Sequence, residues 1–339
     1  MSMADIFRSD LFKMTSLTAA INESETPPQR LAELRIFEEK GVETTSVVIE
    51  KKGSTLDIVP SAPRGAPGAP MNTNPRTGVN LTVPHFPVRD QLLADELQNV
   101  RAFGSDNELE GVEVRRDEKL ANMNLSLDNT EEYHRLGAIQ GIVLDADGSP
   151  LIDLYDEFGV SEPAKVFFDL SAAWASADGG VIRAKILTVK EDVRRALKNA
   201  RVPKLWAACD EVFFSQISNH PEIRETYMAQ AAANDLRGSD ATESFSYGGV
   251  LWELYPGYGD VEIPAGTCQF VPMGVPGLFI SRYAPAPWFS AVNRIGLPRY
   301  AMATPDITGE KYIDLEAQMN GLHICTRPEV LFTGDKDAS

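Results

Sequence analysis

The sequence has few of the residues from which catalytic and metal sites are usually built. Only four histidines and three cysteines occur among its 339 residues. Cys209, Cys268 and Cys325 lie far apart and show neither CxxC spacing nor an even-numbered framework. They are interpreted as small buried or half-buried hydrophobic residues, and the pattern excludes a zinc cluster with ordinary Cys/His spacing.

The short motifs of known catalytic sites are absent as well. The chain contains no GxSxG elbow, no GxxxxGK[ST] loop, no HExxH helix and no Rossmann glycine fingerprint after a strand. The histidines are dispersed along the chain: His85, His134, His220 and His323. A lone histidine is more often a structural residue than a base, so we expect no catalytic residue, no metal site and no cofactor.

The turn that starts at Asp145 resembles the beginning of a calcium loop. An EF-hand needs glycine at its sixth position and glutamate at its twelfth, and this sequence has Pro150 and Asp156 there. The segment is therefore predicted to be a hairpin turn between two short strands.

Long hydrophobic runs are also missing. No run approaches 18 apolar residues, and charged residues interrupt the amino terminus, so we expect no membrane span and no secretory signal. The composition, 43% hydrophobic, is that of a soluble globular protein. The formal net charge of −17 argues against tight nucleic-acid binding, because phosphate contacts need clustered Lys and Arg.

The clearest feature that is present is a long helical pattern over residues 105–141. Ser105 or Asp106 can cap its first turn, and Gly141 stands where a left-handed terminating residue is expected. Apolar residues recur at helical spacing: Leu109, Val112, Leu120, Met123 and Leu127. Such a helix is about 50 Å long. Gly137 interrupts it at a cost of about 1 kcal/mol relative to alanine, which indicates close approach by a neighbouring strand.

Residues 41–88 are predicted to form an extended excursion. Two β-rich runs, 46–50 and 55–59, surround a Lys51-Lys52-Gly53 turn, which is typical of a hairpin. The next residues carry seven prolines between 60 and 87, which forbid a helix or a central strand, and residues 78–83 are predicted to pair as an edge strand. A segment of this kind has no core of its own, so we expect contact with a partner to order it.

The rest of the chain alternates between helical and β-rich patterns. Helices are predicted over residues 15–21, 31–37, 89–102 and 186–200. Strands are predicted over residues 142–144, 151–155, 166–170, 204–209, 244–255, 267–271 and 277–283, and one or two more in the tail after residue 310. The whole is of the α+β class.

This order of elements resembles the major capsid proteins of tailed phages, specifically the family of the phage lambda major head protein, capsid protein E. The stretches that carry the resemblance are residues 47–65 ending in PSAPRG, LQNVRAFG at 97–104, LDNTEEYHRLGAIQG at 127–141, VFFDL at 166–170 and RPEVLF at 327–332.

The resemblance implies the Hong Kong-type phage capsid fold. Its parts would be an N-terminal arm (1–40), an extended β-hairpin loop (41–88), a peripheral domain (89–200 and 306–339) with the spine helix 105–141, and an axial domain (201–305). It implies a chain that self-assembles through hexamers and pentamers into the icosahedral shell around the genome of a tailed double-stranded DNA bacteriophage. The location implied is the virion, with assembly in the host cytoplasm.

The resemblance also implies partners and contact residues. The partners are copies of the chain, a separate scaffolding protein, since no charged helical region precedes the arm, and a portal protein; it allows for a decoration protein. The DNA is enclosed without tight binding. Basic residues of the loop would contact a neighbouring subunit: Lys51, Lys52, Arg64, Arg76 and Arg89. Residues assigned to spine packing are Leu120, Met123, Leu127 and Gly137. Some relatives crosslink a loop lysine to an asparagine, and no such crosslink is expected here.

Two other interpretations remain open from the sequence. One is a soluble α+β carbohydrate-active enzyme that stacks sugars on Trp252, Tyr255, Tyr258 and Trp288, although such residues more often fill loop-rich cores. The 49 carboxylates would allow a glycosidase pair, but nothing singles one out. The other is a minor or decoration protein of the same particle.

Overall fold

The computed structural model describes most of the chain. The described residues are 13–23, 29–51, 77–97, 108–170, 180–198, 202–224, 228, 243–257, 259, 261–306, 309 and 311–337. None of the helices in these ranges is both long and apolar enough to cross a bilayer.

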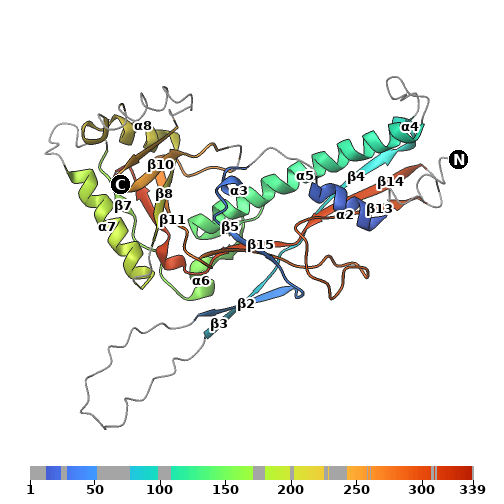
Figure 1. The fold of residues 1–339 in the computed structure, drawn as a ribbon, viewed down its shortest axis with the longest axis horizontal. Coiled ribbons are helices and arrows are strands. Elements are labelled where there is room, and N and C mark those ends of the chain that lie inside the picture. The colour runs from blue at the N-terminus through green and yellow to red at the C-terminus, as the bar shows by residue number, and fades with distance from the viewer. Residues whose placement is uncertain are drawn as a thin grey trace, which may run out of the picture.

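The molecule is elongated, with a sheet at each end and the long helix α5 (Glu108–Gln140) running between them (Figure 1). The predicted helix over 105–141 is therefore present with nearly the predicted bounds. Its 33 residues span about 50 Å at the usual rise per residue. A helix of this length fixes the distance between the two ends of the molecule.

The first sheet contains three antiparallel strands in the order β13-β14-β4. These are β4 (Phe86–Leu93), β13 (Tyr300–Pro305) and β14 (Tyr312–Met319). Helix α5 and the short helix α2 (Met14–Glu23) pack on it and enclose a separate core. The α5 residues in that core are Leu120, Met123 and Leu127.

The helix predicted over residues 89–102 is wrong in its first half. Residues up to Leu93 belong to β4, and α4 (Ala94–Leu97) follows directly. Exposure alternates along β4, and its backbone pairs with β14 over the whole strand. Leu93 and Leu97 have helical spacing, whereas Val88 and Leu92 lie on the same face of a strand, so pairing with a strand more than 200 residues away decides the outcome.

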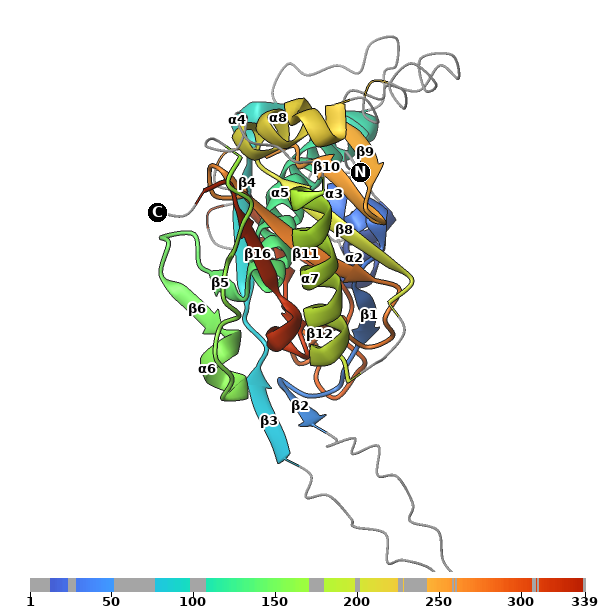
Figure 2. The ribbon, with the colours of Figure 1, turned by 90° about the vertical axis from the view of Figure 1, so that its left-hand side faces the viewer.

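The second sheet has six strands in the order β7-β16-β11-β8-β10-β9. Its members are β7 (Val166–Phe167), β8 (Lys204–Cys209), β9 (Ser244–Tyr247), β10 (Val250–Leu254), β11 (Thr267–Met273) and β16 (Phe332–Asp335). Helices α7 (Val181–Ala196) and α8 (Glu211–Asn219) lie against it (Figure 2). Its core is aromatic, with Trp252 buried among Phe168, Phe213 and Phe270.

A smaller sheet joins the two ends in the order β1-β12-β15. It contains β1 (Glu38–Gly41), β12 (Phe279–Tyr283) and β15 (Gly321–Cys325). The hairpin of β5 (Ile142–Leu144) and β6 (Pro150–Asp153) contains the turn at Asp145, as predicted. The remaining short helices are α3 (Arg30–Leu34), α6 (Leu154–Phe158) and the 3-10 helix η3 (Pro328–Val330). Strands of the predicted axial domain share sheets with strands of the predicted peripheral domain: β11 pairs with β16, and β13 pairs with β14. The division into these two domains stays a prediction.

The predicted hairpin exists, but with a different second strand. Strand β2 (Ser46–Lys51) pairs antiparallel with β3 (Thr77–Thr82), with Lys51 opposite Thr77. Lys51 therefore ends a strand and is not in a turn. Residues 55–59, the predicted partner, lie outside the described residues. Figure 1 shows β2 and β3 at one side of the body, directed away from both large sheets.

Gly137 lies where β5 crosses the end of α5. A Cβ atom added there would be 2.7 Å from the carbonyl oxygen of Ile142 and 2.9 Å from the Cα of Val143. Both are backbone atoms, which cannot move away as a flexible side chain can. Gly141, with a φ of +96°, then lets the chain turn back from the helix into β5.

We predict that Gly137→Leu lowers the free energy of unfolding by about 1–3 kcal/mol, because the added side chain overpacks the contact with β5. Chemical denaturation followed by circular dichroism measures this. Ala121→Leu is the matched control, since Ala121 is exposed on the same helix. A Gly137→Leu protein as stable as the control would show that α5 and β5 do not need this close approach.

Candidate functional site

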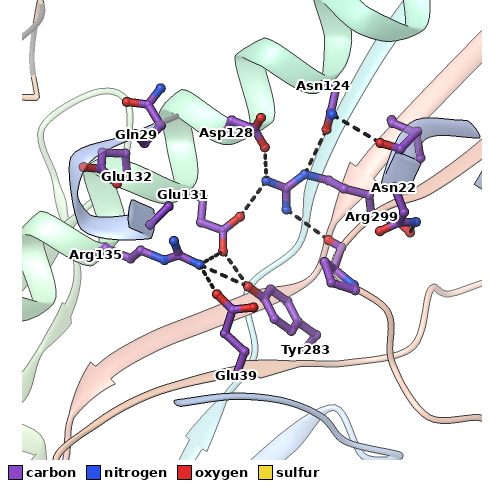
Figure 3. A pocket seen from close by; sticks show the side chains of 13 residues that line it. Asn22, Gln29, Glu39, Asn124, Asp128, Glu131, Glu132, Arg135, Tyr283 and Arg299 are labelled. Carbon is purple, nitrogen blue, oxygen red and sulfur yellow. Dashed lines mark hydrogen bonds and ion pairs between the residues drawn. The ribbon is translucent and has the colours of Figure 1, made fainter. Parts of the chain in front are cut away.

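A network of buried charges forms where α5 passes the middle sheet. Asp128, Glu131 and Arg135 are spaced three and four residues apart, so they share one face of the helix. Arg299, which immediately precedes β13, and Tyr283 at the end of β12 approach this face from the other side (Figure 3). The site is therefore built from segments that are far apart in the sequence.

Glu131 is the centre of this network. Its Oε2 accepts from Nη2 of Arg299 at 2.6 Å, and its Oε1 accepts from Nη2 of Arg135 at 2.6 Å and from the hydroxyl of Tyr283 at 2.5 Å. The same Arg299 nitrogen lies 2.5 Å from Oδ1 of Asp128. The Glu131, Arg135 and Arg299 side chains are each at most 10% exposed. A charge buried to this extent is stable only when it is paired and hydrogen-bonded.

The network also reaches the first part of the chain. Arg135 donates to Glu39 of β1 at 2.7 Å. Nε of Arg299 donates to Asn124 of α5, whose amide donates to the carbonyl of Ile21 at the end of α2. Helix α5, strand β1, helix α2 and the start of β13 are thus tied together by one set of polar contacts.

Electrostatics fix the protonation state of Glu131. Burial disfavours its charged form, but the neighbouring Arg135 and Arg299 guanidiniums outweigh burial and hold the pKa of Glu131 far below its usual range. Burial and the Glu131 carboxylate together raise the pKa of Tyr283 well above its ordinary value. Glu131 therefore stays an anion and Tyr283 stays a hydrogen-bond donor.

Two buried histidines lie beside the network. Burial lowers the pKa of His134 on α5 to about 4 and the pKa of His323 on β15 to about 3. The Glu131 carboxylate, 3.8 Å from Nε2 of His323, favours the protonated form of His323. The positive charges of Arg135 and Arg299, together with His134, disfavour that form. Nδ1 of His323 shares a hydrogen bond with the Ser281 hydroxyl at 2.7 Å. Both rings are neutral at physiological pH.

A cavity of about 300 Å³ opens beside these residues, lined by Gln29, Glu39, Asn124 and Glu132 as well as the network itself (Figure 3). Oε1 of Glu132 accepts from the backbone of Leu31 and from Tyr255, whereas its Oε2 and the Nε of Arg135 are buried without a hydrogen-bond partner among the described residues. The described residues hold no group of three His, Cys, Asp or Glu side chains suited to a metal ion. The arrangement is chemically suited to joining elements of the fold.

The residues predicted for spine packing lie in two places. Leu120, Met123 and Leu127 are at most 3% exposed and pack against the three-stranded sheet, and Gly137 contacts β5. Of the basic residues predicted for an inter-subunit contact, Arg89 pairs with Glu316 of its own chain at 2.8 Å. Lys51 ends β2. Lys52, Arg64 and Arg76 lie outside the described residues.

Sequence reasoning missed the charge network. The only signal on α5 was the pattern DNTEEYHR, in which Asp128, Glu131 and Arg135 fall on one face. Nothing in the sequence connects them with Arg299, which is 168 residues from Glu131.

The aromatic residues proposed as a sugar platform do not form one. Trp252 and Tyr255 are buried in the core of the six-stranded sheet, and Trp288 stacks edge-on against Tyr300 in a separate small core. Tyr258 lies outside the described residues. The described aromatics fill cores, which is their commoner role.

Comparison with known proteins identifies the family. The model of the family described as phage major capsid protein E matches residues 13–336. The chain belongs to this family. The major capsid protein of Salmonella phage Felix O1 is 26% identical over 96% of this chain and 97% of its own length. The major capsid protein of Pseudomonas phage KPP10 is 26% identical over 87% of this chain and 89% of its own.

The fold agrees with this family. A crystal structure of a prophage protein of E. coli CFT073, assigned as a capsid protein, superposes with a TM-score of 0.54 at 12% identity, over 95% of this chain and 98% of that one. The Hong Kong-type capsid fold and the α+β class predicted from the sequence are confirmed. The chain is a major capsid protein of a tailed phage, a structural subunit of a multimeric shell in the virion. This identification is favoured over the enzyme and over the minor virion protein.

We predict that Arg299→Met lowers the free energy of unfolding by about 3–5 kcal/mol, because it leaves Asp128 and part of Glu131 buried without a cation. Thermal and chemical denaturation of the subunit measure the change. The exposed pair of Arg115 and Glu118 on the same helix supplies the control. Arg115→Met should change stability by about 0–1 kcal/mol. Equal changes in the free energy of unfolding for the two substitutions would show that the buried network contributes no more to stability than an exposed ion pair.

We also predict that the subunit loses stability below pH 6.5. Because the folded pKa values of His134 and His323 lie below the unfolded value of 6.5, their contribution is complete above that pH and is lost as pH falls toward 4 and 3. Lowering the pH from 7 to 5 should cost about 2 kcal/mol for each histidine. The double variant His134→Gln, His323→Gln should show a shallower decline in denaturation experiments. A decline as steep as that of the native protein would contradict the assignment.

Proposed function

We propose that this capsid protein builds the continuous shell of the phage head from hexamers and pentamers of one subunit and encloses double-stranded DNA. The observation that carries the proposal is the combination of a rigid body braced by α5 with the β2–β3 hairpin that projects from it. A rigid body sets the spacing of subunits, and a projecting hairpin is suited to reach the next one.

The hairpin supplies the main inter-subunit contact in this proposal. At its root, Val47, Ile49 and Val79 pack against the subunit's own core, while Val48 is 63% exposed. Residues 52–76 are rich in proline and glycine and offer little apolar surface for a core of their own. A specific protein interface usually buries about 1,200 Å² or more in total. We infer that the loop gains this area by lying across an adjacent subunit.

Charge supports the same contact. Lys51, Lys52, Arg64 and Arg76 fall in or next to the loop, whereas the chain as a whole carries a net charge of −17. Arg89 is 75% exposed in its pair with Glu316. Because the Arg89 side chain stays largely in water, although Glu316 is only 16% exposed, we infer that Arg89 can exchange Glu316 for a carboxylate of a neighbour. The basic loop thus meets an acidic neighbouring surface.

The division into arm (1–40), extended loop (41–88), peripheral domain (89–200 and 306–339) and axial domain (201–305) is part of this proposal. Leu120, Met123, Leu127 and Gly137 have the role of holding the spine helix to the peripheral sheet and to β5. In this way the helix transmits a fixed geometry from one end of the subunit to the other.

The proposal extends to partners and location. Assembly takes place in the host cytoplasm with a separate scaffolding protein and a portal protein, and it leaves room for a decoration protein. Packaged DNA is enclosed without tight binding, because a subunit with a net charge of −17 repels phosphates on average. We infer that the chain performs no catalysis, since the carboxylate at the centre of its buried site is held in ion pairs with Arg135 and Arg299.

We predict that a subunit with a shortened loop folds but does not form closed shells. Because Lys51 and Thr77 are opposite each other in the hairpin, residues 52–76 can be replaced by Asn-Gly, which favours a two-residue hairpin turn. Circular dichroism and thermal denaturation should match the native subunit. Electron microscopy should show no closed particles.

A control retains the loop length but replaces Arg64 and Arg76 with glutamine. It distinguishes the effect of the loop's positive charges from the effect of its length. This variant should assemble with reduced yield. Normal particles from the shortened subunit would contradict the proposed contact, and an unfolded product would mean that the loop belongs to the subunit's own core.

A further inference from the structure

The connection between β12 and β13, residues 284–299, presents an apolar surface to solvent. We call it the apolar loop. Thirteen large apolar side chains are exposed among the described residues, and four of them lie in a nine-residue stretch of this loop: Phe289, Val292, Ile295 and Leu297. The Phe289 side chain is fully exposed. Exposed apolar side chains gathered in one short loop in this way mark a contact site.

The apolar loop is held in place by the body. The amide of Gly296 donates to the carbonyl of Val42 at 2.9 Å, directly after β1. A Cβ on Gly296 would be 2.0 Å from the carbonyl oxygen of Tyr283, and a Cβ on Gly41 would be 2.2 Å from the carbonyl oxygen of Gly296. Backbone packing this close leaves the loop little freedom.

The loop also has its own small core. Trp288 packs edge-on against Tyr300 with ring centroids 6.0 Å apart, and Ala286 and Ala291 are buried with them. The Tyr300 hydroxyl accepts from the amide of Leu297 at 3.0 Å. Phe289 therefore projects from an ordered loop, and it loses little conformational entropy when it enters an interface.

A groove lies next to this projecting ring, between the apolar loop and α2. The Ser290 hydroxyl donates to the sulfur of Met14 at 2.9 Å and joins the two elements. The groove has a volume of about 440 Å³, and its apolar lining includes Met14, Ala19, Ile295 and Leu297. It is large enough for an aromatic side chain, so a projecting ring and a receiving groove occur side by side on one subunit.

The charge of the apolar loop differs from that of the chain. Residues 284–299 contain two arginines and no acidic residue, although the chain has 49 Asp and Glu residues. Arg299 is engaged in the buried network, whereas Arg294 is exposed and no ion pair joins it to another described residue. The loop is therefore complementary in charge to the average surface of another copy of this chain.

We propose that the apolar loop is a contact between copies of this subunit in which Phe289 of one copy enters the groove between α2 and the apolar loop of the next. This inference rests on the self-assembly described above. One such contact covers the exposed apolar side chains of the loop and brings Arg294 to an acidic neighbour. It is separate from the contact made by the β2–β3 hairpin.

Photo-crosslinking in assembled particles tests the contact. Phe289 is replaced by benzoylphenylalanine, which retains an aromatic side chain and reacts with nearby C–H bonds. This subunit, at natural isotope abundance, is co-assembled with unmodified subunits labelled with ¹⁵N, so that mass spectrometry distinguishes crosslinks between copies from those within one copy.

The expected product joins the Phe289 peptide of an unlabelled copy to the peptide of α2 or of the apolar loop in a labelled copy. Crosslinks confined to one copy, including crosslinks to its own residues 1–12, would overturn the proposal, and so would crosslinks between copies at a remote surface. Absence of particles from unmodified subunits in the presence of the scaffolding protein would contradict the proposed assembly instead, so the two failures are distinguishable.

A substitution series gives an independent readout. Phe289→Asp places a charge in the proposed groove and should reduce the yield of closed particles by about tenfold or more, as expected for a central interface residue. Phe289→Met keeps an apolar side chain and should assemble normally. Both variants should have the melting temperature of the native subunit, because the ring is exposed there. Wild-type particle yield from Phe289→Asp would overturn the proposal.

Discussion

The structure depends on one buried carboxylate. Glu131 accepts hydrogen bonds from Arg135 on its own helix, from Arg299 before β13 and from Tyr283 at the end of β12. Removing a charge from water is unfavourable by several kcal/mol, and only this complete set of partners compensates for it. Any shift of α5 relative to the two strands would leave a charge unpaired. The network therefore specifies one position of the helix.

Because the network fixes the helix, the subunit consists of a rigid frame and of segments that project from it. The two end sheets, α5 and the middle sheet form a frame whose geometry is fixed by packing and buried charge. The segments that project from the frame, the β2–β3 hairpin and the apolar loop of residues 284–299, present charge and apolar surface that the subunit itself does not use. A shell needs both properties, because a constant frame sets curvature and projecting segments join neighbours.

Much of this architecture could be predicted from the sequence. The long helix followed from the spacing of Leu120, Met123 and Leu127, and the strand at 204–209 followed from a short apolar run. Strand β4 and the true partner of β2 could not be predicted, because long-range pairing decides between patterns that fit locally. The network at Glu131 was equally hidden, since Arg299 is distant in sequence and an isolated arginine near a proline gives no signal.

Electron microscopy of the chain, alone and together with its scaffolding protein, over a range of concentration and ionic strength, tests the central claim most directly. A rigid subunit with projecting contacts should form rings, sheets or closed particles, with subunits at a constant spacing. Small compact oligomers under every condition, with no extended lattice, would contradict the assignment of the chain as a shell-forming capsid protein.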